Sequence, residues 1–353
     1  MFRILAINPG STSTKIGVYE DENPIFVETV AHSYEDLKDF KTINDQKDYR
    51  LNIIKQILKN HNIDKLDAIV ARGGLIKPLK AGGTYEINDA MLHDLQIAIG
   101  GAHSSNLGGL IARSIADEMN IKAYTVDPTV VDELEDKARY SGCKELPRLS
   151  KYHVLNQKAI ARKYAQDRGL KYENVNVVVC HMGGGVSVGA HRKGKCIDVN
   201  NTLDGEGPFT PERAGTLPTG DLIKLCYSGK YSFEEMYSKA VGNGGMVGYV
   251  GSNNFKEITE RAKQGDEDCK KVIEAFTYDV SKFIGAMAIA LENKIDAIIL
   301  TGGIAYAPEA VEPITNYVKH LAPVVVYPGE NELLSLTQGT LRVLRKDEEV
   351  KQY

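Results

Sequence analysis

The sequence feature that most constrains the fold is a pattern that occurs twice in the chain. A strand-like run, a glycine-containing turn and a second strand-like run occupy residues 4–19, and the same shape returns at residues 177–190. Later in each half, an apolar run leads into a pair of glycines, at residues 67–75 and again at residues 296–304. Two elements that recur in the same order predict two copies of one α/β domain, with extra residues inserted into the second copy. Two unrelated α/β domains are the alternative.

The rest of the chain alternates strand-like and helix-like segments. Short apolar runs predict strands at residues 3–8, 15–19, 68–71, 123–126, 176–180, 186–191, 297–301 and 324–327. Helical periodicity predicts helices at residues 50–61, 107–119, 156–168 and 269–293. This alternation favours an α/β fold with partly parallel sheets, and the length of 353 residues favours two domains.

Composition argues against several classes of function. The net charge of −4 argues against nucleic-acid binding, because no excess of cations is available to neutralise phosphates. No apolar run reaches the roughly 18 residues that cross a bilayer, and the N-terminus lacks the pattern of a secretory signal. The five cysteines are scattered without a C-x-x-C pair, which favours reduced thiols and offers no zinc site. We therefore expect a cytoplasmic protein without nucleic-acid or membrane partners.

The turn between the first two predicted strands has the chemistry of a phosphate-binding loop. It reads Asn8-Pro9-Gly10-Ser11-Thr12-Ser13-Thr14-Lys15. Glycine lets backbone N–H groups approach a ligand closely, hydroxyls donate to oxyanions, and lysine adds a positive charge. A plain β-hairpin turn with exposed hydroxyls is the alternative.

Two glycine-rich segments follow apolar strands in the second half. Gly183-Gly184-Gly185 comes after His181, and Gly302-Gly303 comes after the run at residues 297–300. Consecutive glycines cost backbone entropy, so the space that they leave is usually needed. A phosphate chain would use the first space and a flat adenine or ribose the second. A tight turn or a bulge is the alternative at each place.

Three further side chains are candidates for binding or catalysis. Arg72 stands between a predicted strand and a glycine pair, where its guanidinium could bind a carboxylate or a phosphate with two hydrogen bonds. Asp127 stands between a predicted strand and a proline, where it could hold Mg²⁺ or cap a turn. His153 precedes a predicted helix and could donate to a phosphoryl group. A surface ion pair and a buried structural histidine are the alternatives for Arg72 and His153.

The order and spacing of these segments resemble the acetate kinase family, which belongs to the actin-like ATPase superfamily together with sugar kinases and heat-shock chaperones. Residues 8–15 are similar to that superfamily's first phosphate loop, residues 181–190 to its second, and residues 301–304 to its adenosine loop. Two patterns resemble the butyrate kinase and branched-chain fatty-acid kinase branch of the family. They are Cys180-His181-Met182-Gly183-Gly184-Gly185 and Gly207-Pro208-Phe209-Thr210-Pro211-Glu212-Arg213.

The resemblance implies an architecture. It implies two duplicated RNase H-like α/β domains, of the actin-like ATPase kind, that face each other across a cleft. The first domain would comprise residues 1–150 and about 331–353, with a helix at about 331–344 that returns to it. The second domain would comprise residues 151–330 and would bind MgATP.

The resemblance also implies roles for individual residues. Arg72 would bind the substrate carboxylate, His153 would stabilise the phosphoryl group, and Asp127 would be linked to magnesium. Leu217-Pro218 stand where acetate kinases have a second catalytic arginine, and we take Arg213 as the candidate replacement. The expected catalytic residues are thus Arg72, His153, Arg213 and Lys15. The expected nucleotide-binding residues are Asn8, Ser11, Thr12, Ser13, His181, Gly183, Gly184, Gly185, Gly302 and Gly303.

The implied activity is reversible phosphoryl transfer between ATP and the carboxylate of a short-chain fatty acid, as in butyrate + ATP = butyryl phosphate + ADP. Mg²⁺ would be the cofactor, and the enzyme would be a homo-oligomer of two or more chains. Isobutyrate and acetate are alternative substrates. A sugar or polyol kinase would need a carboxylate base, for which Asp127 is the candidate. A nucleotide-switch protein, similar to actin or a chaperone, is the non-enzymatic alternative.

Overall fold

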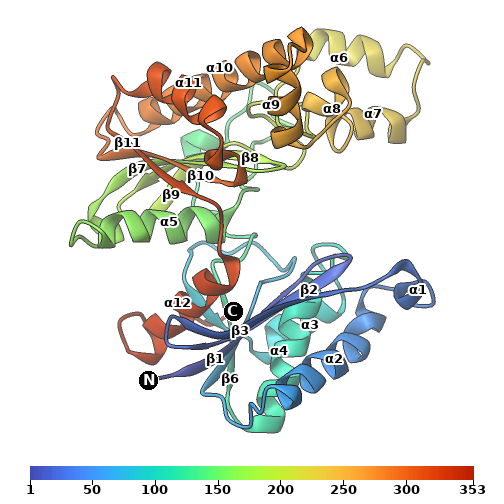
Figure 1. The fold of residues 1–353 in the computed structure, drawn as a ribbon, viewed down its shortest axis with the longest axis vertical. Helices are drawn as coiled ribbons and strands as arrows, with labels where there is room; N and C mark the ends of the chain where they lie inside the picture. Colours follow the sequence, from blue (N-terminus) through green and yellow to red (C-terminus); the bar gives the residue numbers. More distant parts are fainter. The chain divides into compact units, whose positions relative to one another are not determined.

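The computed structural model describes all residues, 1–353, and they divide into two compact units (Figure 1). Unit 1 comprises Met1–Asp132 and Asn331–Tyr353, and unit 2 comprises Glu133–Glu330. The sequence analysis places the boundary after residue 150, whereas the structure assigns residues 133–150 to unit 2. Hydrogen bonds explain the difference, since the Glu135 N–H donates to the Ile197 carbonyl (2.9 Å) and Arg148 Nη1 donates to Asp198 Oδ1 (2.9 Å).

Unit 1 is built on a six-stranded mixed sheet with the strand order β3-β2-β1-β4-β6-β5. The strands are β1 (Arg3–Pro9), β2 (Ser13–Glu20), β3 (Asn23–Ala31), β4 (Ala68–Ala71), β5 (Thr84–Glu86) and β6 (Lys122–Val126). Strands β1, β2 and β3 form an antiparallel meander, while β4 runs parallel to β1 and β6 parallel to β4. The carboxyl ends of β1, β4 and β6 therefore share one edge of the sheet, where Asn8, Arg72 and Asp127 lie.

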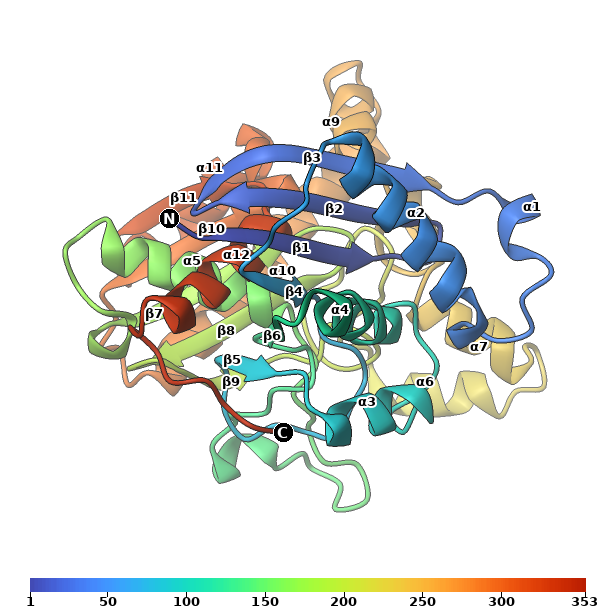
Figure 2. The same ribbon diagram turned by 90° about the horizontal axis from the view of Figure 1, so that it is seen from below.

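Helices cover both faces of this sheet. Helices α2 and α4 lie on one face and α12 on the other (Figure 2). The helices of unit 1 are α1 (Tyr34–Leu37), α2 (Lys47–Asn60), α3 (Asp89–Gln96), α4 (Asn106–Met119) and α12 (Glu332–Leu344). The apolar residues Ile4, Leu5 and Ile7 of β1 are completely buried, as expected for a strand that is covered on both sides.

Unit 2 repeats this plan with a five-stranded sheet in the order β11-β10-β7-β8-β9. The strands are β7 (Asn176–Met182), β8 (Val186–Arg192), β9 (Lys195–Val199), β10 (Ala297–Gly302) and β11 (Val324–Pro328). Strands β7, β8 and β9 form an antiparallel meander, and β10 and β11 continue the sheet in parallel on the other side of β7. Written in the opposite direction, as β9-β8-β7-β10-β11, this order matches β3-β2-β1-β4-β6 of unit 1 strand for strand, which confirms the predicted duplication.

The sheet of unit 2 separates two apolar cores. Val177 and Val179 belong to the core on the side of helix α5. Val178 and Cys180 belong to the core on the opposite side, which also contains residues of the long helix α10. This alternation follows from the two-residue period of a strand. The helices of unit 2 are α5 (Val154–Gln166), α6 (Thr219–Cys226), α7 (Phe233–Ala240), α8 (Gly245–Val250), α9 (Phe255–Lys263), α10 (Glu267–Ala290) and α11 (Pro308–Val318).

The predicted strands and long helices are all present, with ends that differ by up to three residues. The strands β3, β5 and β9 were not predicted, nor were the helices α1, α3 and α11 and the short helices α6 to α9 that are inserted between β9 and α10. Strand β3 lies at the sheet edge, and most of its side chains are exposed, so its apolar signal is weak. None of the helices combines the length and the hydropathy that crossing a bilayer requires.

Candidate functional site

The turn between β1 and β2 is held from behind by a buried arginine. Arg50 of α2 is 1% exposed, and its Nη1 donates to the carbonyls of Gly10 (2.8 Å) and Ser13 (3.1 Å). Its Nη2 donates to the carbonyl of Ser11 (3.1 Å). The carbonyl oxygens are thereby occupied by a cation, while the side chains of Ser11, Thr12 and Lys15 are exposed and that of Ser13 is half-buried. An anion would meet donors rather than acceptors here.

Arg50 was not among the residues expected from the sequence, because it gives no local signal apart from being a charged residue within a helix. Burial lowers the pKa of its guanidinium, but the hydrogen bonds to the turn satisfy the charged group. The loop that was predicted to bind phosphate therefore has a preformed shape.

Asn8 and Arg72 lie at the ends of two adjacent parallel strands and share one carboxylate. Arg72 Nη1 lies 2.7 Å from Glu332 Oε1, and Asn8 Nδ2 donates to Glu332 Oε2. Glu332 is the first residue of α12, and no sequence signal pointed to it. The two donors thus form a small carboxylate-binding arrangement at the end of β1 and β4. His103 lies nearby, and burial, followed by the charge of Arg72, lowers its pKa.

Asp127 follows β6 with a left-handed backbone (φ +43°) and is 1% exposed. Its Oδ1 accepts from the Gly83 N–H (2.7 Å), and its own N–H donates to the Gly83 carbonyl (2.9 Å). These reciprocal bonds hold a backbone conformation that non-glycine residues rarely adopt.

The donor set fits a magnesium ion of the kind that nucleotides carry. No group of three or more His, Cys, Asp or Glu side chains in the chain could hold a metal ion. Magnesium in nucleotide sites takes only one or two protein carboxylates, and phosphate oxygens and waters complete its octahedron. Asp127 would be the one protein carboxylate for such an ion.

In unit 2, the turn between β7 and β8 carries the three glycines. Thr210 Oγ1 donates to the Gly184 carbonyl (2.7 Å), which joins this turn to the loop that contains Arg213. A Cβ added to Gly185 would lie 2.3 Å from Arg213 Nη1, so the glycine provides the space in which the guanidinium lies.

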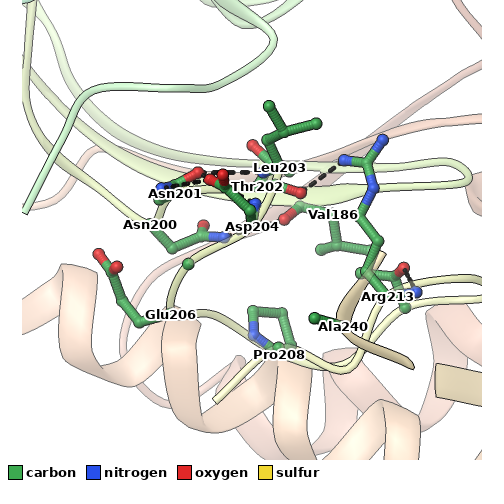
Figure 3. Close-up of a pocket in the computed structure, with 13 residues that line it drawn as sticks. Val186, Asn200, Asn201, Thr202, Leu203, Asp204, Glu206, Pro208, Arg213 and Ala240 are labelled. Atoms are coloured by element: carbon green, nitrogen blue, oxygen red, sulfur yellow. Dashed lines mark hydrogen bonds between the residues drawn. The ribbon is translucent and has the colours of Figure 1, made fainter. Parts of the chain in front are cut away.

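Arg213 lies in a polar pocket formed by the loop after β9 (Figure 3). Its Nη1 donates to the Thr202 carbonyl, and Asn201 Nδ2 donates to Asp204 Oδ1 in the same pocket (3.1 Å). Burial lowers the pKa of the guanidinium, while the carboxylates of Glu212 and Asp204 oppose that shift. The arginine is therefore held as a partly desolvated cation beside the glycine turn.

His181 and His153 lie against each other with ring centroids 4.2 Å apart. His181 is 2% exposed, and its Nε2 lies 3.4 Å from Glu330 Oε2. His153 precedes α5, and its Nδ1 lies 2.9 Å from Ser187 Oγ. Three expected site residues, His153, His181 and Gly183, therefore come from neighbouring elements of one unit.

A second pocket in unit 2 has a volume of about 750 Å³, which lies in the usual range for small-molecule sites. Gly183 and Gly184 line one part of it, and Gly303 with Ile304 and Tyr306 lines another. Gly302 has φ +90°, and a Cβ there would lie 2.3 Å from the Met182 carbonyl oxygen, so the chain turns sharply at this point. The glycine turn after β7 and the turn after β10 thus line one continuous pocket within unit 2.

The expected residues therefore form two groups. Unit 1 carries Asn8, Ser11, Thr12, Ser13, Lys15, Arg72 and Asp127. Unit 2 carries His153, His181, Gly183, Gly184, Gly185, Arg213, Gly302 and Gly303. Their roles remain predictions.

Two copies of one mixed α/β domain, each with a loop of donors at the first β-turn, define the actin-like ATPase fold of the acetate and sugar kinases. The crystal structure of Porphyromonas gingivalis acetate kinase has this fold, with a TM-score of 0.78 at 18% identity over 98% of this chain and 100% of that one. The acetokinase family model matches residues 147–347.

Two relatives match along the whole length. A probable butyrate kinase of Clostridium botulinum (strain Eklund 17B / Type B) is 56% identical over 100% of this chain and 99% of its own. Butyrate kinase 1 of Clostridium acetobutylicum is 53% identical over all of both chains. The chain belongs to the acetokinase family.

Proposed function

We propose that this protein is a butyrate kinase, which transfers a phosphoryl group reversibly between ATP and the carboxylate of butyrate. The observation that carries the proposal is the identity of 53–56% to butyrate kinases over the full length of the chain. The chemistry of the two groups of site residues agrees with this activity.

The acceptor carboxylate needs no general base, because a carboxylic acid is already ionised at neutral pH. Catalysis then depends on positioning and on neutralising charge. Arg72 and Asn8 already donate to a carboxylate, that of Glu332, which supports a role for Arg72 in binding butyrate or butyryl phosphate. Arginine is suited to this role because its planar guanidinium can donate two parallel bonds.

The nucleotide would bind to unit 2. The pocket beside Gly303 and Tyr306 would take the adenosine, and the glycine turn at Gly183 and Gly184 would take the phosphates. Arg213 and His153 would stabilise the charge on the oxygens of the transferring group. The exposed Lys15 of unit 1 would supply a positive charge for phosphate oxygens.

Asp127 would hold Mg²⁺, directly or through water. When bound, the ion supplies charge neutralisation at the nucleotide phosphates. The carboxylate of Asp127 is suited to this because its backbone is fixed by both bonds to Gly83.

We further propose that the protein is a cytoplasmic homo-oligomer that forms ATP from butyryl phosphate in fermentation. Exposed apolar side chains support an oligomer, since Ile223, Phe233 and Tyr249 are 53%, 77% and 77% exposed in or near α6 to α8. Discrimination between butyrate and its neighbours is expected to be modest, because one methylene changes the preference by about 1–3 kcal/mol.

Hydroxylamine trapping of the acyl phosphate tests the proposal. Purified protein with MgATP is given acetate, propionate, butyrate, isobutyrate or valerate, and ADP release is followed with glucose and glycerol. Hydroxamate is expected with the four-carbon acids and little with acetate. Strong turnover of acetate would change the substrate assignment. ADP release that requires a polyol, without any hydroxamate, would refute a carboxylate kinase.

A further inference from the structure

A chain of buried hydrogen bonds connects His153 to the interior of unit 2. Four of its members come from the start of α5 and from β8, and the fifth, Tyr172, begins the short 3-10 helix Tyr172–Asn174. His153 and Gln157 are four residues apart at the start of α5, and Ser187 and His191 lie on the same face of β8. Gln157, Ser187 and His191 are all completely buried.

The distances describe an unbroken relay. Tyr172 Oη lies 2.6 Å from His191 Nδ1, and His191 Nε2 lies 2.7 Å from Gln157 Oε1. Gln157 Nε2 lies 2.7 Å from Ser187 Oγ and 3.0 Å from the Ser187 carbonyl oxygen. Ser187 Oγ lies 2.9 Å from His153 Nδ1.

The donors in this relay can be assigned from one fixed point, the Ser187 carbonyl. A carbonyl oxygen only accepts, so the Gln157 NH₂ must face Ser187 and the Gln157 oxygen must face His191. His191 therefore carries a proton on Nε2 and accepts at Nδ1 from the Tyr172 hydroxyl.

The same reasoning assigns the hydroxyl proton of Ser187 and, through it, the tautomer of His153. The second N–H of Gln157 donates to Ser187 Oγ, and the hydroxyl proton of Ser187 then points to His153 Nδ1. If His153 donated from Nδ1 instead, the buried Ser187 hydroxyl would accept twice and its proton would lose this acceptor, which is costly in an interior. Every donor in the relay thus points in one direction, and such chains polarise cooperatively.

We propose that Tyr172, His191, Gln157 and Ser187 are positioning residues that hold His153 in the tautomer with its proton on Nε2. That tautomer presents an N–H donor to an anionic phosphoryl oxygen, whereas the other tautomer would present a lone pair. The inference rests on the proposed function only for the role of His153 in phosphoryl transfer. The tautomer itself follows from the hydrogen bonds.

The glycine between the two relay residues of β8 explains how the Gln157 amide fits between them. A Cβ added to Gly189 would lie 2.3 Å from Gln157 Oε1 and 3.1 Å from Cys196 Sγ. Only a glycine leaves room for the amide to lie between Ser187 and His191. The strand sequence Ser187-Val188-Gly189-Ala190-His191 therefore carries the relay as a unit.

Nitrogen NMR of the whole protein tests the tautomer without turnover. The chain has eight histidines, so ¹⁵N-histidine labelling gives a simple spectrum, and the variant His153→Gln identifies the His153 signals. At about pH 8 a histidine with an ordinary pKa is neutral. We expect protonated Nε2 and unprotonated Nδ1 in the wild type, and loss of this preference in Ser187→Ala. A proton on Nδ1 of His153 in the wild type would overturn the inference.

Kinetics test whether the tautomer matters for the reaction. Ser187→Ala should lower kcat by about tenfold or more with unchanged KM for butyrate and ATP, because His153 would lose the partner that fixes its tautomer. Ser187→Thr restores a hydroxyl and should recover much of kcat. Ser281→Ala is the matched control, since Ser281 is a buried serine of α10 that donates to the Thr277 carbonyl.

The NMR and kinetic measurements distinguish a failure of the proposed positioning role from a failure of the proposed kinase function. If Ser187→Ala changes the His153 tautomer but leaves kcat like that of the Ser281→Ala control, the positioning role is refuted. If the wild type shows no kinase activity but the expected NMR signature, the proposed function fails while the tautomer assignment stands.

Discussion

The substitution Gly185→Ala tests whether the glycine turn of unit 2 exists to admit Arg213. An added Cβ would lie 2.3 Å from Arg213 Nη1 and 2.9 Å from its Cζ. Both distances are below any real contact, and the obstructing atoms are the end of a flexible side chain. The guanidinium is therefore expected to move and to lose its bond to the Thr202 carbonyl.

The magnitude follows from what Arg213 would contribute to the reaction. Removing one preorganised donor from a transition state costs about 100- to 1,000-fold in kcat, or about 2.7–4 kcal/mol. Gly185→Ala should lose the same amount as Arg213→Ala, since each removes the guanidinium from its place. The kcat of purified variants with butyrate and MgATP, measured by hydroxamate formation, gives both numbers.

A double-mutant cycle makes this reasoning refutable. If Gly185 acts only by leaving space for Arg213, the double variant should be no slower than Arg213→Ala alone. Losses that multiply would show that Gly185 and Arg213 act independently. A wild-type kcat in Gly185→Ala would refute the steric argument, and circular dichroism would exclude misfolding as the cause of a loss.

Three other predictions follow from the structure. Arg72→Ala should lower kcat/KM for butyrate by roughly 10- to 100-fold, the loss of a charged hydrogen bond of about 1.5–3 kcal/mol, with little change in KM for ATP; an equal rise in the KM for ATP would count against carboxylate binding. Lys158→Met should destabilise the protein by about 3–5 kcal/mol in urea unfolding, because the lysine and its partner Glu133 have side chains only 2% and 3% exposed. A loss below about 1 kcal/mol would show that Glu133 is accommodated without its cation. The pKa of Asp266 is lowered from 3.8 to about 2, mainly by the Cys269 N–H. A lowered carboxylate pKa stabilises the fold above pH 3.8, and this contribution disappears as the pH falls toward 2. Asp266→Asn should therefore flatten the decline of unfolding free energy with acid between these values, and an unchanged acid profile would contradict this assignment.

Much of the fold could be predicted because its signals are local. The predicted strands, the long helices and the duplication follow from two-residue and 3.6-residue periods and from glycine turns, each contained within a few neighbouring residues. The boundary between the two units could be predicted less well from the sequence. Residues 133–150 carry no strong period, and their place was decided by bonds such as those of Glu135 and Arg148 to β9.

The candidate site was predictable only in part for the same reason. Its loops could be identified from glycine, hydroxyl and cationic residues that stand next to one another. Arg50, which holds the first turn, and Gln157, which bonds to the buried His191 and Ser187, could not be identified, because each acts on residues that are distant in the sequence.

The sequence alone therefore determined the class of fold, its duplication and the residue types of the two phosphate loops. Only the tertiary structure decided which side chains meet. Asn8 and Glu332 are 324 residues apart, yet they share a hydrogen bond because β1 and α12 pack in the same unit. The relay from Tyr172 to His153 likewise exists only because side chains at the start of α5 and on the helical turn at Tyr172 meet side chains of β8. The physical reason is that local patterns specify which element forms, whereas the partner of a polar group depends on which elements pack against each other.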